Sequence, residues 1–333
     1  MLILTFIGLI GLLIIGHEFG HFIAAKLFKL KVEEFGIGFP PRVFSKKIGE
    51  TKYSINAVPF GGFVKIFGEN KEQAETPEDE KRSFAAQPIW KKTVILVAGV
   101  AMNFLIGWLA LSAVFAIGTE PKGIKIISVL EDSPAMQAGL KPGEIITGFE
   151  SLESFQTYLA QNEGKAITLN SKEVTPRTEF TESEGRIGVT ISETMYGRGV
   201  LHGLKLGFTT SVYIIGAIFQ ALGGIVISLF NGGEVLDSVA GPVGIFGIVK
   251  STSEMGTIFL VQLAGILSLN LAVFNILPIP ALDGGRLSFV VAEKILGRRL
   301  NQKTEYLANA VGFGLLILLA IIVTISDIAK LLT

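Results

Sequence analysis

Residues 2–26 read LILTFIGLIGLLIIGHEFGHFIAAK, and the only ionisable residues among them are His17, Glu18, His21 and Lys26. A helix needs roughly 20 predominantly apolar residues to cross a bilayer. The stretch therefore predicts a membrane-spanning helix. Ionisable groups are costly in an apolar medium unless something compensates them, so a cluster of three inside such a helix indicates function.

Three further stretches without charge occur at residues 93–119, 256–282 and 306–326. We therefore expect four transmembrane helices, at about residues 2–26, 93–117, 257–278 and 307–325. The composition agrees, with 49% hydrophobic residues and a mean hydropathy of +0.55. The chain is thus predicted to be a polytopic α-helical membrane protein. Its first stretch lacks the basic start and the A-x-A site of a signal peptide, so we expect it to stay in the mature protein.

His17 and His21 lie four residues apart and therefore share one face of a helix. With Glu18 they form the H-E-x-x-H pattern, in which two imidazoles bind zinc and the glutamate activates water. The alternative is a chance match whose histidines only hydrogen-bond to neighbours. The chain has three histidines, and two of them fall at this spacing inside the predicted span, which favours the metal site. We expect His202, the third, to be solvated.

A catalytic zinc ion normally takes three protein ligands and keeps one position for water. The chain has no cysteine, so a carboxylate must supply the third ligand, and Asp283 in NLAVFNILPIPALDGGRL is the best candidate. Pro278 and Pro280 break the helix before it, and Gly284 and Gly285 are expected to let the backbone turn after it. The alternative is a loop carboxylate that caps the segment after it. Together with H-E-x-x-H, the pattern favours the metal.

Residues 206–230 are long and apolar enough for a fifth span. His17 and His21 lie toward the inner end of the first helix, and Asp283 must lie at the same membrane face to reach them. A crossing at 206–230 would put Asp283 on the opposite face. We therefore expect residues 204–250 to form an interfacial amphipathic region, in which residues 206–230 lie along the outer surface or dip into it.

Charge indicates the orientation of the chain in the membrane. Residues 26–92 hold 13 basic and 9 acidic residues, and residues 286–303 hold 5 basic residues and one acid. Residues 119–203 hold 8 basic and 12 acidic residues. By the positive-inside rule the first two segments are cytoplasmic and the third faces outward, which puts the predicted active site toward the cytoplasm. The net charge of zero gives no reason to expect a nucleic-acid partner.

Two segments outside the spans have distinct patterns. Residues 31–92 begin with Gly, Pro and alternating stretches such as YSINAVPFGGFVKIF, which predict a membrane-associated β-hairpin region on the cytoplasmic side. Residues 122–193 have the order strand, SPAMQAGLKPGE (133–144), helix and strand. This order resembles a bacterial PDZ domain. The alternative is a small α/β domain of another kind.

HEFGH in the first span, NILPIPALDGG (275–285) in a late one and the PDZ-like insertion between them resemble the site-2 protease family of intramembrane zinc metalloproteases. More narrowly, they resemble its PDZ-containing bacterial branch, of the regulator-of-sigma-E protease type, which cleaves anti-sigma factors and signal-peptide remnants. The resemblance implies Zn²⁺ as cofactor, with His17, His21 and Asp283 as ligands and Glu18 as the catalytic glutamate. Asn275 matches an asparagine implicated in holding substrate, although a helix–helix hydrogen bond is the alternative.

A further segment, AGVAMN (98–103), resembles one in the second span of the family, where proline often follows the glycine. Val100 stands at that place, so the segment gives little support for a role of Asn103. The predicted boundaries are the first transmembrane helix at 1–30, the hairpin and loop region at 31–92 and the second transmembrane helix at 93–118. The PDZ-like domain follows at 122–193, the interfacial region at 204–250 and the last two transmembrane helices at 257–285 and 305–328.

The implied function is regulated intramembrane proteolysis of single-span membrane proteins by a multi-pass protein of the cytoplasmic membrane. Its partners would be a membrane-spanning polypeptide and the lipid bilayer, and the sequence does not indicate an oligomeric state. The region 53–67 would hold an unwound substrate by β-addition. Two other classes compete, namely a membrane metal transporter and a non-catalytic PDZ scaffold. Transporters typically show internal repeats, and a scaffold would not need Glu18 or a metal.

Overall fold

The computed structural model describes residues 2–69, 76–118, 122–149, 151–181, 184–194, 196–197, 199–231, 241–298 and 300–332. The chain forms two compact units. The helical unit consists of residues 1–111 and 208–333, and the α/β unit of residues 112–207. Two long helices run from one unit into the other, α3 (Ile89–Ile117) and α6 (Val200–Phe230).

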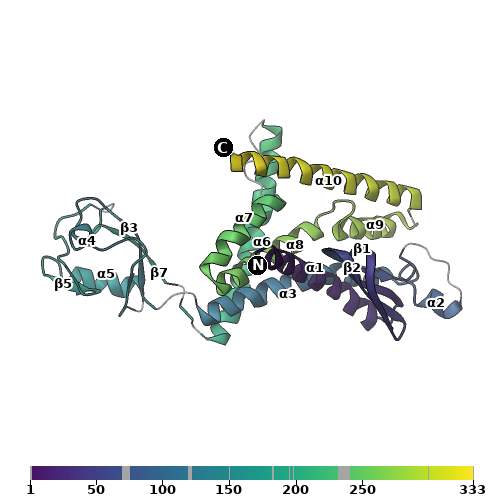
Figure 1. Cartoon of the computed structure of the whole chain (residues 1–333), viewed down its shortest axis with the longest axis horizontal. Helices are drawn as coiled ribbons and strands as arrows, with labels where there is room; N and C mark the ends of the chain where they lie inside the picture. The colour runs from purple at the N-terminus through teal and green to yellow at the C-terminus, as the bar shows by residue number, and fades with distance from the viewer. Residues whose placement is uncertain are drawn as a thin grey trace. The chain divides into compact units, whose positions relative to one another are not determined.

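Long apolar helices dominate the helical unit (Figure 1). Besides α3 and α6 they are α1 (Leu2–Leu27), α8 (Thr257–Ile276) and α10 (Gln302–Leu332). Within the described residues, five helices are long and apolar enough to cross a membrane. The chain is therefore a polytopic membrane protein, as the sequence predicts.

The expected number of four spans is not confirmed, because the fifth candidate is Val200–Ser228 in α6. An interfacial position of residues 204–250 would keep Asp283 and the two histidines on one membrane face. Instead, a continuous helix of 31 residues covers the first part of that region, and α7 (Pro242–Met255) covers the last part. Residues 232–240 of the region lie outside the described residues. The interfacial position therefore stays a prediction.

Close packing of α1 against α3 sets the frame of the helical unit. A Cβ atom on Gly20 of α1 would lie 2.3 Å from the carbonyl oxygen of Ala98 on α3. On the other side of α3, a Cβ atom on Gly107 would lie 2.7 Å from the Leu269 side chain of α8. Small residues let helix backbones approach in this way within membranes. The face of α1 that carries the histidines therefore lies directly on α3.

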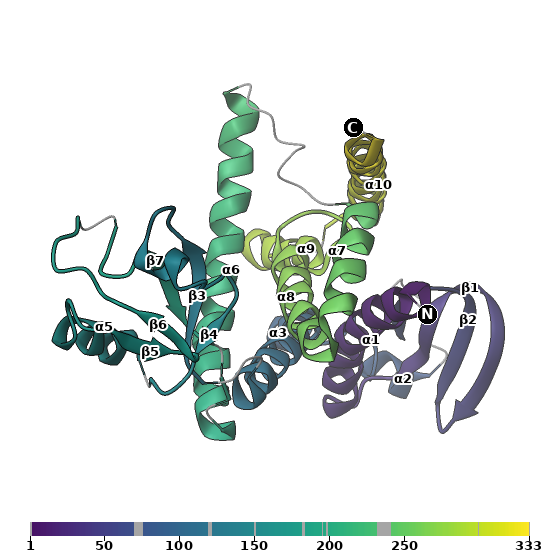
Figure 2. The ribbon, with the colours of Figure 1, turned by 60° about the vertical axis from the view of Figure 1, so that its left-hand side comes forward.

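The predicted hairpin is present. Strands β1 (Val32–Ile48) and β2 (Thr51–Ile66) pair antiparallel, from Val32 opposite Ile66 to Ile48 opposite Thr51, with several irregularities in register. The hairpin extends beside α1 (Figure 2). Large apolar side chains on it are exposed, among them Phe39, Val43 and Phe44, which suits contact with lipid.

An ion-pair cluster fixes the tip of the hairpin to neighbouring segments. Glu50, in the turn between the strands, accepts hydrogen bonds from Lys26 at the end of α1 (2.8 Å) and from Arg82 after the short helix α2 (Pro77–Lys81) (2.8 and 2.7 Å). Partial burial would raise the pKa of Glu50, but these two cations outweigh it and hold the pKa below its ordinary value. The hairpin therefore has a defined position relative to the end of α1 that carries the histidines.

The chain breaks between α8 and α9 (Asp283–Leu296), as the two prolines predict. The helix predicted at about 257–278 ends at Ile276. One detail differs from the expectation, because Gly284 and Gly285 lie inside the first turn of α9. A Cβ atom on Gly284 would lie 2.2 Å from the carbonyl oxygen of Leu277, and one on Gly285 would lie 2.2 Å from that of Ile279. The glycines therefore serve close packing of α9 on the preceding loop, not a turn after Asp283.

The α/β unit has a conventional apolar core. Strands β3 (Ile124–Val129), β4 (Ile145–Ile146) and β7 (Val189–Glu193) form one sheet in the order β4-β3-β7, and β5 (Ile167–Leu169) pairs with β6 (Lys172–Val174). The helices are α4 (Pro134–Gln137) and α5 (Leu152–Gln161). Ile124, Ile126, Phe155 and Ile187 are among the buried core residues. The elements follow the order expected from the sequence, and the PDZ assignment stays a prediction.

Candidate metal centre

Three side chains that are far apart in the sequence converge in the helical unit. His17 Nε2 lies 2.8 Å from Asp283 Oδ2, and His21 Nε2 lies 3.1 Å from the same oxygen. The two Nε2 atoms are 3.1 Å apart. Both imidazoles are buried, and the carboxylate is half-buried. The first span and the break before α9 therefore meet at one point, across 266 and 262 residues of sequence.

The partner of His21 Nδ1 decides which nitrogen of that imidazole carries the proton. His21 Nδ1 lies 2.8 Å from the backbone carbonyl oxygen of Ile95 on α3. A carbonyl oxygen only accepts, so Nδ1 carries the hydrogen. In the neutral imidazole, Nε2 then offers a lone pair toward the centre of the cluster.

His17 has a matching partner on α3. Its Nδ1 lies 3.2 Å from the side-chain nitrogen of Asn103, which is fully buried. As assigned, the Oδ1 atom of Asn103 is buried without a partner. The two ends of an amide are assigned from the hydrogen-bond network. Turning the amide by 180° lets Oδ1 accept from a protonated His17 Nδ1. Both Nε2 atoms then point lone pairs at a carboxylate oxygen.

This set of atoms fits a zinc ion. A tetrahedral zinc ion with ligand distances of about 2.0–2.1 Å separates neighbouring ligand atoms by roughly 3.3 Å. The three separations observed, 2.8, 3.1 and 3.1 Å, are close to that value. Two neutral imidazoles with protons on Nδ1 leave no proton to join three electron-rich atoms. A cation at their centre is the group that would stabilise them together.

A glycine makes room for the imidazoles. A Cβ atom on Gly99 of α3 would lie 2.3 Å from His21 Nε2 and 2.7 Å from His17 Cε1. Any larger residue at this position would displace both rings from the centre. Gly99 and Asn103 lie four residues apart and therefore on one face of α3, and both contact the imidazoles from that face.

Glu18 extends toward the hairpin and not into the group of three. A Cβ atom on Gly62 of β2 would lie 3.3 Å from Glu18 Cγ. Glu18 is half-buried and follows His17 directly. Its carboxylate is thus available beside the cluster without being one of the three converging side chains.

The remaining predicted residues are placed as follows. Asn275 is half-buried in the last turn of α8, eight residues before Asp283, and is not one of the three converging groups. His202 is exposed, as expected for a solvated side chain. Asp283 is the first residue of α9, after the N-cap residue Leu282, and the hydrogen-bond partners of its carboxylate within the described residues are His17 and His21, so the capping alternative is not supported.

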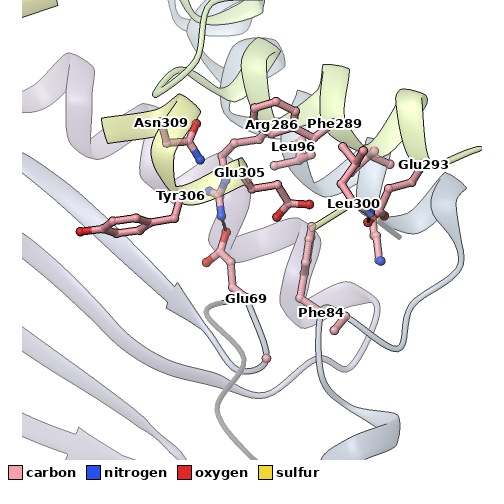
Figure 3. Close-up of a pocket in the computed structure, with 14 residues that line it drawn as sticks. Glu69, Phe84, Leu96, Arg286, Phe289, Glu293, Leu300, Glu305, Tyr306 and Asn309 are labelled. Atoms are coloured by element: carbon pink, nitrogen blue, oxygen red, sulfur yellow. Dashed lines mark hydrogen bonds and ion pairs between the residues drawn. The ribbon is translucent and has the colours of Figure 1, made fainter. Parts of the chain in front are cut away.

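A cavity of about 610 Å³ lies along α9 beyond Asp283 (Figure 3). Its walls include Phe84, Leu96, Phe289 and Glu293. Arg286, one turn after Asp283, points at Glu69 and forms an ion pair with it (Figure 3). A chamber with polar groups thus lies along the helix that begins with Asp283.

Comparison with known proteins identifies the family. The model of peptidase family M50 matches residues 5–319. The chain belongs to peptidase family M50. This family is the site-2 protease family, so the protein is a zinc metalloprotease with Zn²⁺ as its cofactor. Membership decides against the transporter and scaffold alternatives.

Individual relatives cover nearly the whole chain. A protein of Clostridium perfringens whose name describes a zinc metalloprotease is 35% identical over 95% of this chain and 95% of its own length. The regulator of sigma-W protease RasP of Bacillus subtilis is 29% identical over 99% of this chain and 98% of its own. That alignment runs over 419 positions, so RasP contains segments that this 333-residue chain lacks.

Sequence reasoning missed the residues that surround the three converging groups. A departure from the family pattern at Val100 gives little support for a role of Asn103, yet the amide of Asn103 contacts His17. The spacing of Gly99 and Asn103 was visible, but nothing local connects it to the first span. Asn309 of α10, which contacts the segment before Asp283, has no sequence signal that would single it out.

Proposed function

We propose that this zinc metalloprotease performs regulated intramembrane proteolysis of single-span membrane proteins, with its zinc held by His17, His21 and Asp283. One observation carries the proposal: two imidazole Nε2 atoms and a carboxylate oxygen lie within 2.8–3.1 Å of one another inside a bundle of apolar helices. Such a group is costly in an apolar interior unless something compensates it, and a metal cation at its centre would do so.

Zinc bound there would polarise the scissile carbonyl and lower the pKa of a bound water molecule. Asn103 and the Ile95 carbonyl would keep the two imidazoles in the orientation and tautomer that ligation requires. Such outer partners are an ordinary part of zinc sites, and both come from α3 here.

Glu18 would act as general base and then as general acid. It would take a proton from the attacking water and deliver it to the leaving amine. Its position beside the cluster, with its side chain at Gly62 of β2, supports this role because an attacking water must lie between the metal and a base.

The substrate would be held as an extended strand. A helix hides its amide groups in hydrogen bonds, so it must unwind before a protease can attack it. In the described residues the first part of β2, residues 52–55, pairs with β1 on both sides, whereas residues 62–66 pair with β1 on one side only. The other side of residues 62–66 is therefore an edge that can accept another strand. Because β2 approaches Glu18 at Gly62, a peptide added there would run past the base. Asn275 would help to hold its backbone.

The physiological substrates would be anti-sigma-factor-like proteins or signal-peptide remnants. The name of the Bacillus relative, a regulator of sigma-W protease, supports the first. We further propose that the protein lies in the cytoplasmic membrane with its active site toward the cytoplasm and the PDZ-like α/β unit outside.

The test is cleavage by the purified full-length protein. It is incubated in detergent with a panel of single-span membrane peptides, with and without a zinc chelator, and with zinc added back. We expect cleavage within the spanning segment that the chelator abolishes and zinc restores. Cleavage confined to soluble, extended peptides would contradict the intramembrane assignment, and chelator-resistant cleavage would contradict the metal mechanism.

A further inference from the structure

The segment that leads into Asp283 has an unusual backbone. Between the end of α8 and the start of α9, Ala281 has a φ of 76°, in the left-handed region. A residue with a Cβ atom adopts this region only where its surroundings enforce it. Ala281 lies two residues before Asp283, so its conformation helps to set the direction in which the carboxylate leaves the loop.

The last helix supplies a contact that enforces this conformation. Asn309 Oδ1 on α10 accepts a hydrogen bond of 3.0 Å from the backbone N–H of Ala281. The bond joins residues 28 apart in sequence. Asn309 projects from α10 and is one of the residues that line the cavity along α9 (Figure 3).

Direct packing of α10 on the same loop accompanies the hydrogen bond. Gly312 lies three residues after Asn309, on the same face of the helix, and it is buried. A Cβ atom on Gly312 would lie 2.5 Å from the carbonyl oxygen of Pro280. Residues 280 and 281 are therefore held against one face of α10 by contact and by hydrogen bonding.

We propose that Asn309 is a positioning residue for Asp283, which keeps Ala281 in the left-handed conformation and so holds the carboxylate at the two imidazoles. Without the acceptor, the Ala281 N–H loses its partner and the residue can relax to a negative φ. The peptide planes before Asp283 then rotate, and Oδ2 leaves the position 2.8–3.1 Å from both Nε2 atoms. This inference rests on the proposed function, because it assumes that the three residues hold zinc.

A simpler role for Asn309 is general packing of α10 against the rest of the helical unit. The two roles predict different results. If Asn309 is a packing residue, substituting it lowers the unfolding temperature of the whole protein but leaves the zinc affinity of the folded fraction unchanged. If Asn309 is a positioning residue, substituting it lowers zinc affinity. The loss is smaller when residue 281 is glycine, because glycine adopts positive φ without steric penalty.

The experiment measures zinc affinity of the full-length protein in detergent by competition with a chromophoric chelator. Asn309→Leu removes the acceptor at similar size, and we expect a roughly tenfold weaker zinc affinity, in the range for outer partners of zinc ligands. Asn309→Ala, which adds no bulk, serves as a second variant with the same expectation. In an Ala281→Gly background, we expect either change to weaken affinity by less than about threefold, since the strain is gone.

Thr324→Val is the matched control, because Thr324 also lies on α10 and its hydroxyl donates one hydrogen bond, to Ala320 of the same helix. We expect it to leave zinc affinity unchanged. Unchanged affinity in both Asn309 variants would overturn the proposal, and so would an equal loss in the wild-type and Ala281→Gly backgrounds. The wild-type protein separates the two levels of inference: if it binds no stoichiometric zinc, the proposed metal site fails, whatever Asn309 does.

Discussion

The helical unit and the α/β unit both have apolar cores, but among the described residues only the helical unit buries ionisable side chains. The interior of the α/β unit is a cluster of apolar residues that includes Ile126, Phe155 and Leu159. The helical unit buries His17, His21 and Asn103, while several large apolar side chains on α10, such as Leu318, are more than half exposed. A unit surrounded by lipid gains little from hiding apolar surface. Its interior is therefore available for polar chemistry, and its stability depends on close packing and satisfied hydrogen bonds.

The sharpest way to test the polar interior is to remove its base without changing its shape. Glu18→Gln is expected to reduce the cleavage rate by roughly 10²–10⁴-fold, the usual contribution of general acid–base catalysis. Zinc content should stay at the wild-type level, because Glu18 is not among the three converging residues. Rate and bound zinc are measured on the same preparation. Glu33→Gln, on β1 and paired with Lys65, is the matched control, and proteolysis retained in Glu18→Gln would refute the assigned role.

The apolar core of the other unit offers the opposite experiment. Phe155 is fully buried there, so Phe155→Ala should lower the stability of the α/β unit by about 3–5 kcal/mol. Hydrogen exchange of the β3 and β7 amides in the full-length protein would report this loss. Zinc content should not change, since all three converging residues belong to the helical unit. If Phe155→Ala lowers both the zinc content and the hydrogen-exchange protection of the β-strands, the two units do not behave separately.

Asp283, the proposed third ligand, can be replaced with almost no change in volume. Asp283→Asn should reduce zinc affinity by about 100-fold or more, because even outer partners of zinc ligands contribute 10–100-fold. Chelator competition measures the change. Asp79→Asn, in the short helix α2 and paired with Lys31, is the control. Wild-type zinc content in Asp283→Asn under competition would count against ligation by this residue.

One substitution made in both units compares their outer and inner surfaces directly. Leu318 on α10 is 53% exposed, and Leu159 in the α/β core is 5% exposed. Leu318→Ala should change stability by less than about 0.5 kcal/mol, because lipid replaces the lost contacts. Leu159→Ala should lower it by about 2–5 kcal/mol. Thermal unfolding in lipid nanodiscs measures both, and equal losses would contradict the contrast between the units.

Local patterns in the sequence were sufficient for much of the site. The spacing of His17 and His21 places them on one face of a helix, since neighbours three or four residues apart always share a face. The prolines before Asp283 predict the break at which α8 ends. The alternating residues after the first span predict the hairpin of β1 and β2, whose pairing the structure confirms. Each of these features depends on residues within a few turns of one another.

Features that require distant segments were predicted poorly or missed. The role of Gly284 and Gly285 was wrong, because what restricts them is carbonyl oxygens of the preceding loop and not the turn after Asp283. The sequence offered little support for Asn103 because Val100 departs from the family segment, whereas the contact that matters is with His17, 86 residues away in sequence. Four membrane spans were expected from the positions of the site residues, yet α6 is a fifth helix long and apolar enough to cross a membrane.

The sequence by itself determined which residues are capable of the chemistry, namely two imidazoles on one helical face, an adjacent glutamate and an aspartate after a helix break. Only the tertiary structure decided that these groups meet and which partners hold them. Helical periodicity is set by the backbone geometry of a few neighbouring residues. Convergence across 262–266 residues depends instead on how closely α1, α3, α8 and α10 pack, and that is the combined result of many small contacts.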